Sequence, residues 1–204
     1  MNFRAIFAFS VTLLLLISCK RSNDELFFEG HRLSTEKKYD KAIEIYSHLL
    51  ERDDKLQLAY YNRGICQMEL KKYSSALADF NRIIDLQTYG GDFVVAWNKD
   101  MPFASDEVKA QVAYYDALYE RAQVQYYLDS LDESFADFKV LVANNAEQKS
   151  NCLLWMGTIY KRKGNTEKAC EYFKSAKATA VSSVDEQQAD QLIAANCDVT
   201  RNNR

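Results

Sequence analysis

Apolar positions recur along this chain at the spacing of helices, and the whole pattern repeats after 34 residues. Small and aromatic residues return after that interval, so that Gly30, Ala42 and Tyr46 are followed by Gly64, Ala76 and Phe80. Two weaker copies come later, as Ala122, Ser134 and Phe138 and as Gly157, Ala169 and Phe173. A fixed period of this length indicates an array of stacked repeats.

Each repeat is predicted to form two helices. In the second repeat, Tyr60 and Gly64 fall on one face at helical spacing, and Phe80 lies on the inner face of a later helix. The stretch 71–74 breaks the pattern between them. In the fourth repeat the break contains Gly164, which favours the left-handed conformation that ends a helix.

The small residues have a physical cause. Glycine inside a helix costs about 1 kcal/mol relative to alanine. Two antiparallel helices joined by a short turn must approach closely, and a small residue permits that approach. The recurring aromatic residue then fills the space between the helices, and burying such a ring contributes roughly 1.5–3 kcal/mol. We therefore expect the small residues to lie where paired helices cross.

The pattern predicts an all-α fold, a right-handed α-solenoid of stacked helix-turn-helix repeats with a C-terminal capping helix. A final helix is needed to cover the last apolar face of such an array. The predicted segments are a signal peptide at 1–18, repeats at 23–90, an insert at 91–114, repeats at 115–183, the capping helix at 184–198 and a disordered tail at 199–204.

The insert at 91–114 interrupts the period and is apolar in its first half. Large apolar groups are usually buried. This segment is therefore expected either to pack on the array as a plug, which could also cover the binding face, or to contact a partner. From Ser105, a plausible helix cap, a helical pattern runs toward Leu128 and into the third repeat.

Composition and motifs argue against several classes of function. The formal net charge is −3 with both signs interspersed, so no basic stripe indicates nucleic-acid binding. The two histidines, His31 and His48, are isolated, and no spacing matches a zinc site. Nucleophile-elbow and phosphate-loop motifs are absent from the sequence. We therefore expect no enzyme activity, no metal and no cofactor.

The first residues are typical of a targeting segment. Arg4 precedes an apolar run, 5–17, that is short for a membrane span. Leu16-Ile17-Ser18-Cys19 resembles a bacterial lipobox, which implies cleavage after Ser18 and acyl chains such as palmitate on Cys19. An ordinary secretory signal is the alternative. Because Lys20 rather than Asp follows the cysteine, the resemblance favours the outer membrane, on its periplasmic or surface side.

The repeats resemble the tetratricopeptide repeat. The resemblance rests on the run 59–64 followed by Tyr73, Ala76, Phe80 and Ile83, and it extends over about four-fifths of the mature chain. Relatives of this kind bind ligands on a concave groove formed by the first helix of each repeat. By position, that groove here consists of Phe27, His31, Tyr61, Ile65, Met68, Tyr119, Gln123, Tyr126, Leu154, Thr158 and Lys161.

The resemblance also indicates what the groove would bind. Relatives that hold the C-terminal carboxylates of chaperones use Lys and Asn in this face. Phe27 and Tyr61 occupy the places of that Lys, so chaperone-tail binding is not expected. An aromatic and apolar groove favours a peptide segment or an amphipathic helix.

Of the five cysteines, four lie beyond the targeting segment. Cys170 is near the start of the second helix of repeat four, and Cys197 is near the end of the next helix. Antiparallel packing brings those ends together, and the compartment would be oxidising. We predict a disulfide between them, with two buried free thiols as the alternative. Cys66 and Cys152 are expected to be small apolar core residues.

These features predict a non-enzymatic, membrane-anchored scaffold of the bacterial cell envelope, binding a protein partner within an outer-membrane or wall assembly complex. Two alternatives remain open at this stage. Groove tyrosines could stack on sugars in a glycan- or nutrient-binding surface lipoprotein, or the chain could be a structural subunit of an envelope secretion complex.

Overall fold

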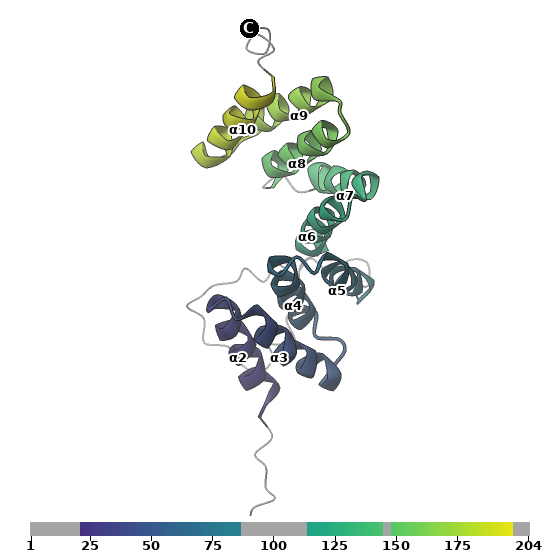
Figure 1. The fold of residues 1–204 in the computed structure, drawn as a ribbon, viewed down its shortest axis with the longest axis vertical. Coiled ribbons are helices and arrows are strands. Elements are labelled where there is room, and N and C mark those ends of the chain that lie inside the picture. Colours follow the sequence, from purple (N-terminus) through teal and green to yellow (C-terminus); the bar gives the residue numbers. More distant parts are fainter. Residues whose placement is uncertain (1–20, 87–113, 145–147, 198–204) are drawn as a thin grey trace, which may run out of the picture.

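A computed structural model describes residues 21–86, 114–144 and 148–197 (Figure 1). The described residues form helices only, stacked along one long axis. The helices are α2 Asn23–Thr35, α3 Tyr39–Arg52, α4 Gln57–Glu69, α5 Tyr73–Leu86, α6 Tyr114–Tyr127, α7 Leu131–Asn144, α8 Lys149–Arg162, α9 Thr166–Ala178 and α10 Ser183–Asn196. The predicted all-α solenoid of helix pairs is confirmed.

Several predicted features lie outside the described residues. These are the signal peptide at 1–18 with Cys19, most of the insert at 91–114, and the tail at 199–204. The long helix predicted from Ser105 is described only from Tyr114 onward, as α6.

The start of α2 is fixed by its own sequence. Ser22 accepts a hydrogen bond from the Glu25 backbone N–H at 3.1 Å, and the Glu25 carboxylate accepts one from the Ser22 N–H at 2.8 Å. This reciprocal arrangement is a capping box, which satisfies two backbone donors that the helix leaves unpaired. The first repeat therefore begins with a strong local signal.

The small residues lie where the paired helices cross, as predicted. A methyl group added at Gly64 would lie 2.8 Å from the Phe80 ring, and one at Gly157 would lie 2.5 Å from the Phe173 ring. The aromatic partners at this repeat position are completely buried in all four repeats, as Tyr46, Phe80, Phe138 and Phe173. The close approach thus leaves no room for a Cβ atom at Gly64 and Gly157, and one ring fills the space within each helix pair.

The turn inside each repeat has a common geometry. Lys37, Lys71, Asp129 and Gly164 occupy the same position of the four repeats, and all have positive φ, between 57° and 78°. At each turn, backbone N–H groups donate to carbonyls of the preceding helix, as Lys71 N does to Met68 O at 2.8 Å. Only the fourth repeat places glycine, the residue that adopts this conformation without steric cost, at this position.

Replacing Lys71 with glycine is expected to raise the free energy of unfolding by about 1 kcal/mol, because glycine relieves the left-handed strain. A matched control is Ser74→Gly, an exposed site within α5 where glycine should lower stability by about 0.5 kcal/mol. Urea denaturation of both variants measures the difference. Destabilisation by Lys71→Gly would contradict the assigned backbone conformation.

Arginine–aspartate pairs connect helices within the two central repeats. Arg63 donates to both carboxylate oxygens of Asp79, at 2.8 and 2.7 Å, and Arg121 does the same to Asp137 at 2.8 and 2.9 Å. Both aspartates are buried. The remaining guanidinium nitrogen of Arg63 reaches Ser47 in the preceding repeat at 3.0 Å. Each arginine–aspartate pair therefore connects the two helices of its own repeat. One guanidinium nitrogen of each arginine also reaches the preceding repeat.

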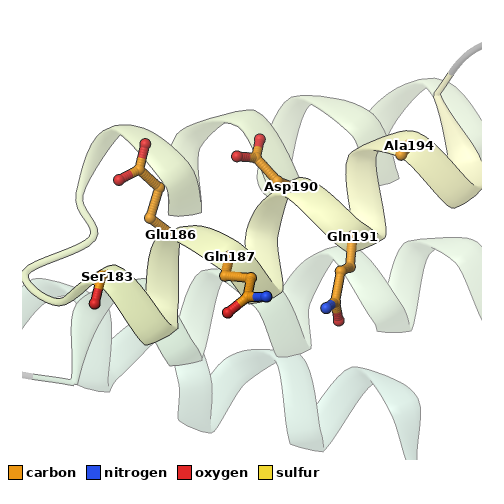
Figure 2. Close-up of a pocket in the computed structure, with 6 residues that line it drawn as sticks. All are labelled: Ser183, Glu186, Gln187, Asp190, Gln191 and Ala194. Atoms are coloured by element: carbon orange, nitrogen blue, oxygen red, sulfur yellow. The ribbon is translucent and has the colours of Figure 1, made fainter.

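The last helix, α10, has the character of a cap. Ala189 is fully buried, and Leu192, Ile193 and Cys197 pack against the core of the last repeats. Beside these packed residues, α10 carries an open hollow of about 450 Å³ lined by Ser183, Glu186, Gln187, Asp190, Gln191 and Ala194 (Figure 2). Because the exposed residues of α10 are mostly polar, with Val184 as an exception, the array can end here with little apolar surface exposed.

Candidate functional site

The eleven residues predicted to form the groove come from the first helices of the repeats, α2, α4, α6 and α8. Nine of them are accessible in the structure, eight half-buried and Lys161 exposed. We call these nine the first-helix face. Its members are His31, Tyr61, Ile65, Met68, Tyr119, Gln123, Tyr126, Thr158 and Lys161.

The other two predicted residues lie in the core. Phe27 is 1% exposed and its ring lies 5.9 Å from that of Tyr46, the aromatic residue that seals the first repeat. Leu154 is 4% exposed and belongs to the core shared by α6 to α9. Both side chains are buried by helix packing, so the assignment of these two residues to an open face was wrong.

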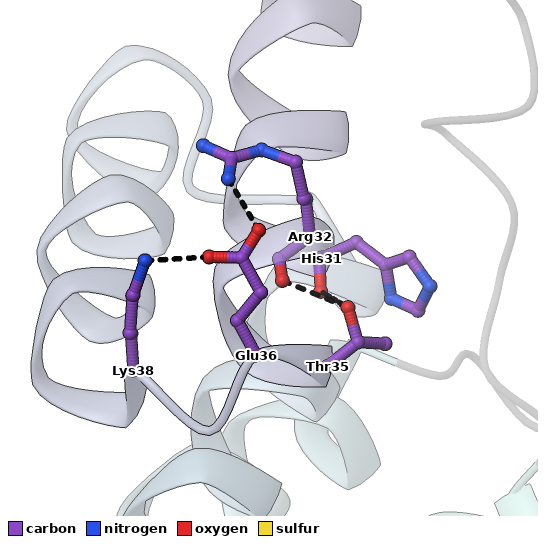
Figure 3. A network of polar contacts seen from close by, with 5 residues as sticks. All are labelled: His31, Arg32, Thr35, Glu36 and Lys38. Atoms are coloured by element: carbon purple, nitrogen blue, oxygen red, sulfur yellow. Dashed lines mark hydrogen bonds and ion pairs between the residues drawn. The ribbon is translucent and has the colours of Figure 1, made fainter.

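His31 lies at the N-terminal end of the first-helix face. Its imidazole points away from a network in which Glu36 accepts from Arg32 at 2.6 Å and from Lys38 at 2.7 Å (Figure 3). These two cations lower the pKa of Glu36. Partial burial lowers the pKa of His31, so this histidine is predominantly neutral at pH 7.

Aromatic side chains form the middle of the first-helix face. Tyr61 meets Phe80 edge to face at 6.0 Å between ring centroids, and Tyr119 meets Phe138 in the same way at 5.9 Å. Tyr126 of α6 contacts Trp155 of α8 at 5.3 Å. Because these rings pack against Phe80, Phe138 and Trp155, the side chains are held in place. The face thus offers a preformed aromatic surface rather than flexible side chains.

Glu120 is a member of this site that the sequence prediction missed. Its carboxylate oxygens accept hydrogen bonds from the Tyr61 hydroxyl at 3.4 Å and from Gln123 Nε2 at 3.0 Å. Burial is the main cause that raises the pKa of Glu120, to about 7, and the Asp116 carboxylate adds to it. Only its contact with Tyr61, on another helix, reveals its place in the site, and no local sequence signal marks it.

Cys170 of α9 and Cys197 at the end of α10 lie at disulfide distance, as predicted, with their Cα atoms 5.6 Å apart. Cys66 and Cys152 are free and buried in the core. Burial raises the pKa of both thiols, which keeps them protonated and unreactive.

Peptide mapping of the unreduced chain is expected to recover Cys170 and Cys197 in one cross-linked peptide, while Cys66 and Cys152 stay alkylatable after denaturation. Recovery of Cys170 and Cys197 as separate, alkylated peptides would contradict the pairing.

Two hollows of the described surface lie away from the first-helix face. One is the polar hollow on α10, and the other, of about 220 Å³, lies on α8 and α9 and is lined by Tyr160, Lys168, Glu171, Tyr172 and Ser175. Within the described ranges, no three or more His, Cys, Asp or Glu side chains are grouped to hold a metal ion. No helix from α2 to α10 is long and apolar enough to cross a membrane.

Comparison with known sequences supports the repeat assignment. The tetratricopeptide repeat family matches residues 58–86 and 151–179, in repeats two and four. Heat shock protein STI1 of Saccharomyces cerevisiae is 38% identical over 64 residues, 31% of this chain and 11% of that protein. Dynein axonemal assembly factor 4 of Mus musculus is 28% identical over 147 residues, 70% of this chain and 32% of that protein.

Solved structures share the fold. MamA from Desulfovibrio magneticus has a TM-score of 0.61 at 17% identity, with 78% of this chain and 76% of that chain covered. The C-terminal part of a repeat protein from Cytophaga hutchinsonii has a TM-score of 0.61 at 16% identity, with 83% of this chain and 58% of that chain covered. The Cut9–Hcn1 hetero-tetramer of the APC/C has a TM-score of 0.62 at 11% identity, with 87% of this chain and 30% of that chain covered.

Residues 58–86 and 151–179 thus match the tetratricopeptide repeat family, and the helix stack has the fold of solved repeat structures such as MamA. The matched repeat family is one of protein–protein interaction scaffolds, which are typically non-enzymatic. The curated relatives are much longer, since the chain spans 11% and 32% of their lengths.

Proposed function

We propose that the chain is a non-enzymatic scaffold that binds a peptide or helix of a partner protein on the first-helix face. The observation that carries the proposal is the row of half-buried aromatic and apolar side chains contributed by α4 and α6, chiefly Tyr61, Ile65, Met68, Tyr119 and Tyr126. Such side chains are enriched where proteins bind each other, because they bury large area at low entropic cost.

Ring contacts favour a peptide over a glycan as the ligand. Stacking on a sugar requires a free ring face. One face of Tyr126 is covered by the Arg162 guanidinium at 4.8 Å, and Tyr127 is stacked on Tyr73 at 4.8 Å with an angle of 9° between the rings. These contacts reduce the ring-face area left for a sugar, while ring edges and hydroxyl groups remain to match peptide side chains and backbone.

The cellular setting is the second part of the proposal. The lipobox-like run that ends at Cys19 supports anchoring of the chain by acyl chains to the bacterial cell envelope, with the outer membrane favoured by Lys20. More than one acyl chain is needed for stable anchoring. A scaffold held in this way would recruit its partner to an outer-membrane or wall assembly complex.

A pull-down tests the binding face. The affinity-tagged full chain is expected to recover a partner from solubilised envelope, and the Tyr61→Ala/Tyr126→Ala variant is expected to lose it. Tyr172→Ala, which removes a half-buried ring from α9, is the matched control and should behave as the wild type. Equal recovery of the partner by all three proteins would show that the first-helix face is not the binding site.

Labelling with an alkyne analogue of palmitate tests the anchor. We expect the wild type to be labelled and to sediment with membranes. Cys19→Ala should be unlabelled and released to the soluble fraction, because it lacks the thiol that would carry the diacylglyceryl group. An unlabelled wild-type chain in the soluble fraction would refute the anchoring proposal without affecting the binding face.

A further inference from the structure

Glu120 occupies an unusual position for a carboxyl group. It is half-buried on α6, beside the aromatic middle of the first-helix face. Its two hydrogen bonds come from the neutral groups of Tyr61 and Gln123. Partly burying a carboxyl group without a cation costs free energy. Such an arrangement is more common at functional sites than in purely structural positions.

The arginines carried by the neighbouring helices are engaged elsewhere. Arg63 is the only cation of α4, and Arg121 is the only cation of α6. Each is held by both oxygens of an aspartate on its second helix, Asp79 or Asp137. On α8, Arg162 pairs with Asp129 at 3.1 Å and donates to the Tyr126 carbonyl at 2.8 Å. The two arginines nearest in sequence to the site are thus committed to structure.

The surroundings of Glu120 match one kind of ligand side chain. Lysine and arginine have long apolar stems that lie along aromatic surface while their charged ends reach a carboxylate. Tyr61 of α4, which donates to Glu120, and Tyr119, which precedes Glu120 in α6, provide such surface near the carboxylate. A cation near tyrosine rings also gains from attraction to the ring faces.

We propose that the first-helix face binds a peptide segment that places a lysine or arginine side chain against Glu120, with apolar neighbours of that residue on the tyrosines. This inference rests on the proposed function and names the partner's chemistry. The ammonium or guanidinium group would replace the missing cation, and Tyr61 and Gln123 would keep the carboxylate oriented toward it. An acidic or neutral segment would leave the carboxylate unpaired in the interface.

Selection from a random peptide library displayed on phage tests the proposal. The full chain, purified in detergent, is used at about pH 8, where Glu120 is ionised. We expect enrichment of peptides with Lys or Arg at one fixed position between apolar residues. Glu120→Gln should lose that preference, whereas Glu133→Gln, an exposed site on α7, should keep it.

A double-substitution cycle then measures the interaction between Glu120 and the basic residue of the peptide. Replacing the basic residue of an enriched peptide with Gln should weaken binding to wild type by about 30-fold or more, as should Glu120→Gln alone. The peptide substitution should have little further effect on the Glu120→Gln variant. Loss of binding by this variant would not reflect unfolding, because removing a buried charge is expected to stabilise it at this pH.

The outcomes separate the two proposals. Enriched peptides without a basic position, or equal affinity for wild type and Glu120→Gln, would overturn this inference and leave the binding face intact. No enrichment, or enrichment that survives Tyr61→Ala/Tyr126→Ala, would overturn the proposed function itself. Self-association that Tyr61→Ala abolishes in analytical ultracentrifugation would make a second copy the occupant and would also overturn the inference.

Discussion

Replacing Asp79 with alanine is expected to lower the free energy of unfolding by about 3–5 kcal/mol. The Asp79 side chain is only 5% exposed, and its loss leaves the largely buried Arg63 guanidinium without its partner. Because Arg63 also bonds Ser47 of the preceding repeat, the change should loosen the contact between repeats as well. Urea denaturation followed by far-UV circular dichroism measures the loss.

Two controls isolate the buried pair. Asp85→Ala removes an exposed aspartate from the same helix and should change stability by less than about 0.5 kcal/mol. The double variant Arg63→Met/Asp79→Leu removes both charges together, and it should cost much less than Asp79→Ala because no charge is left unpaired. Equal losses for Asp79→Ala and Asp85→Ala would show that the pair does not hold the repeat together.

Replacing Glu120 with glutamine is expected to make the chain more stable at pH 8 by up to about 3 kcal/mol. The pKa of Glu120 is about 7 in the fold, against 4.5 for an unperturbed glutamate. Between these values the folded chain holds a proton that the unfolded chain has released. The contribution of Glu120 to the stability of the wild type should therefore fall as pH rises from about 4.5 to 7.

The difference between wild type and Glu120→Gln reports this group alone, because other titrating groups are common to both proteins. This difference in the free energy of unfolding should be near zero below about pH 4, grow as the pH rises from about 4.5 to 7, and level off above about pH 8. Thermal or urea denaturation across that range gives the curve. A pH-independent difference would mean that Glu120 has an ordinary pKa and is not held in a buried site.

The repeat pattern predicted much of the fold because the same physical demand recurs in every unit. Gly64 and Phe80 are linked by a close helix crossing, and that demand appears in the sequence as a fixed interval. Likewise, the Cys170–Cys197 pairing followed from the antiparallel order of helices. An arginine–aspartate pair also occurs in each of repeats two and three, with the same separation of 16 residues. These pairs were missed because a single charge on a helix resembles an ordinary solvated residue.

The candidate site was predicted less well, because position in a repeat gives the direction of a side chain but not what covers it. Phe27 and Leu154 have groove positions and yet are buried by neighbouring rings and helices. Glu120 lies one residue beyond the groove position of Tyr119, and only the packing of α6 beside α4 brings it to Tyr61. Such three-dimensional contacts have no signature within a single repeat.

Photo-cross-linking in native host cells tests most directly whether the first-helix face is where a partner binds. A photoreactive amino acid is placed at Ile65 or Gln123 on this face, and at Lys139, an exposed site on the second helix α7. The account predicts a discrete covalent adduct from Ile65 and Gln123, absent from Lys139 and lost with Tyr126→Ala. Adducts from Lys139 alone, or equal adducts from all three sites, would contradict it.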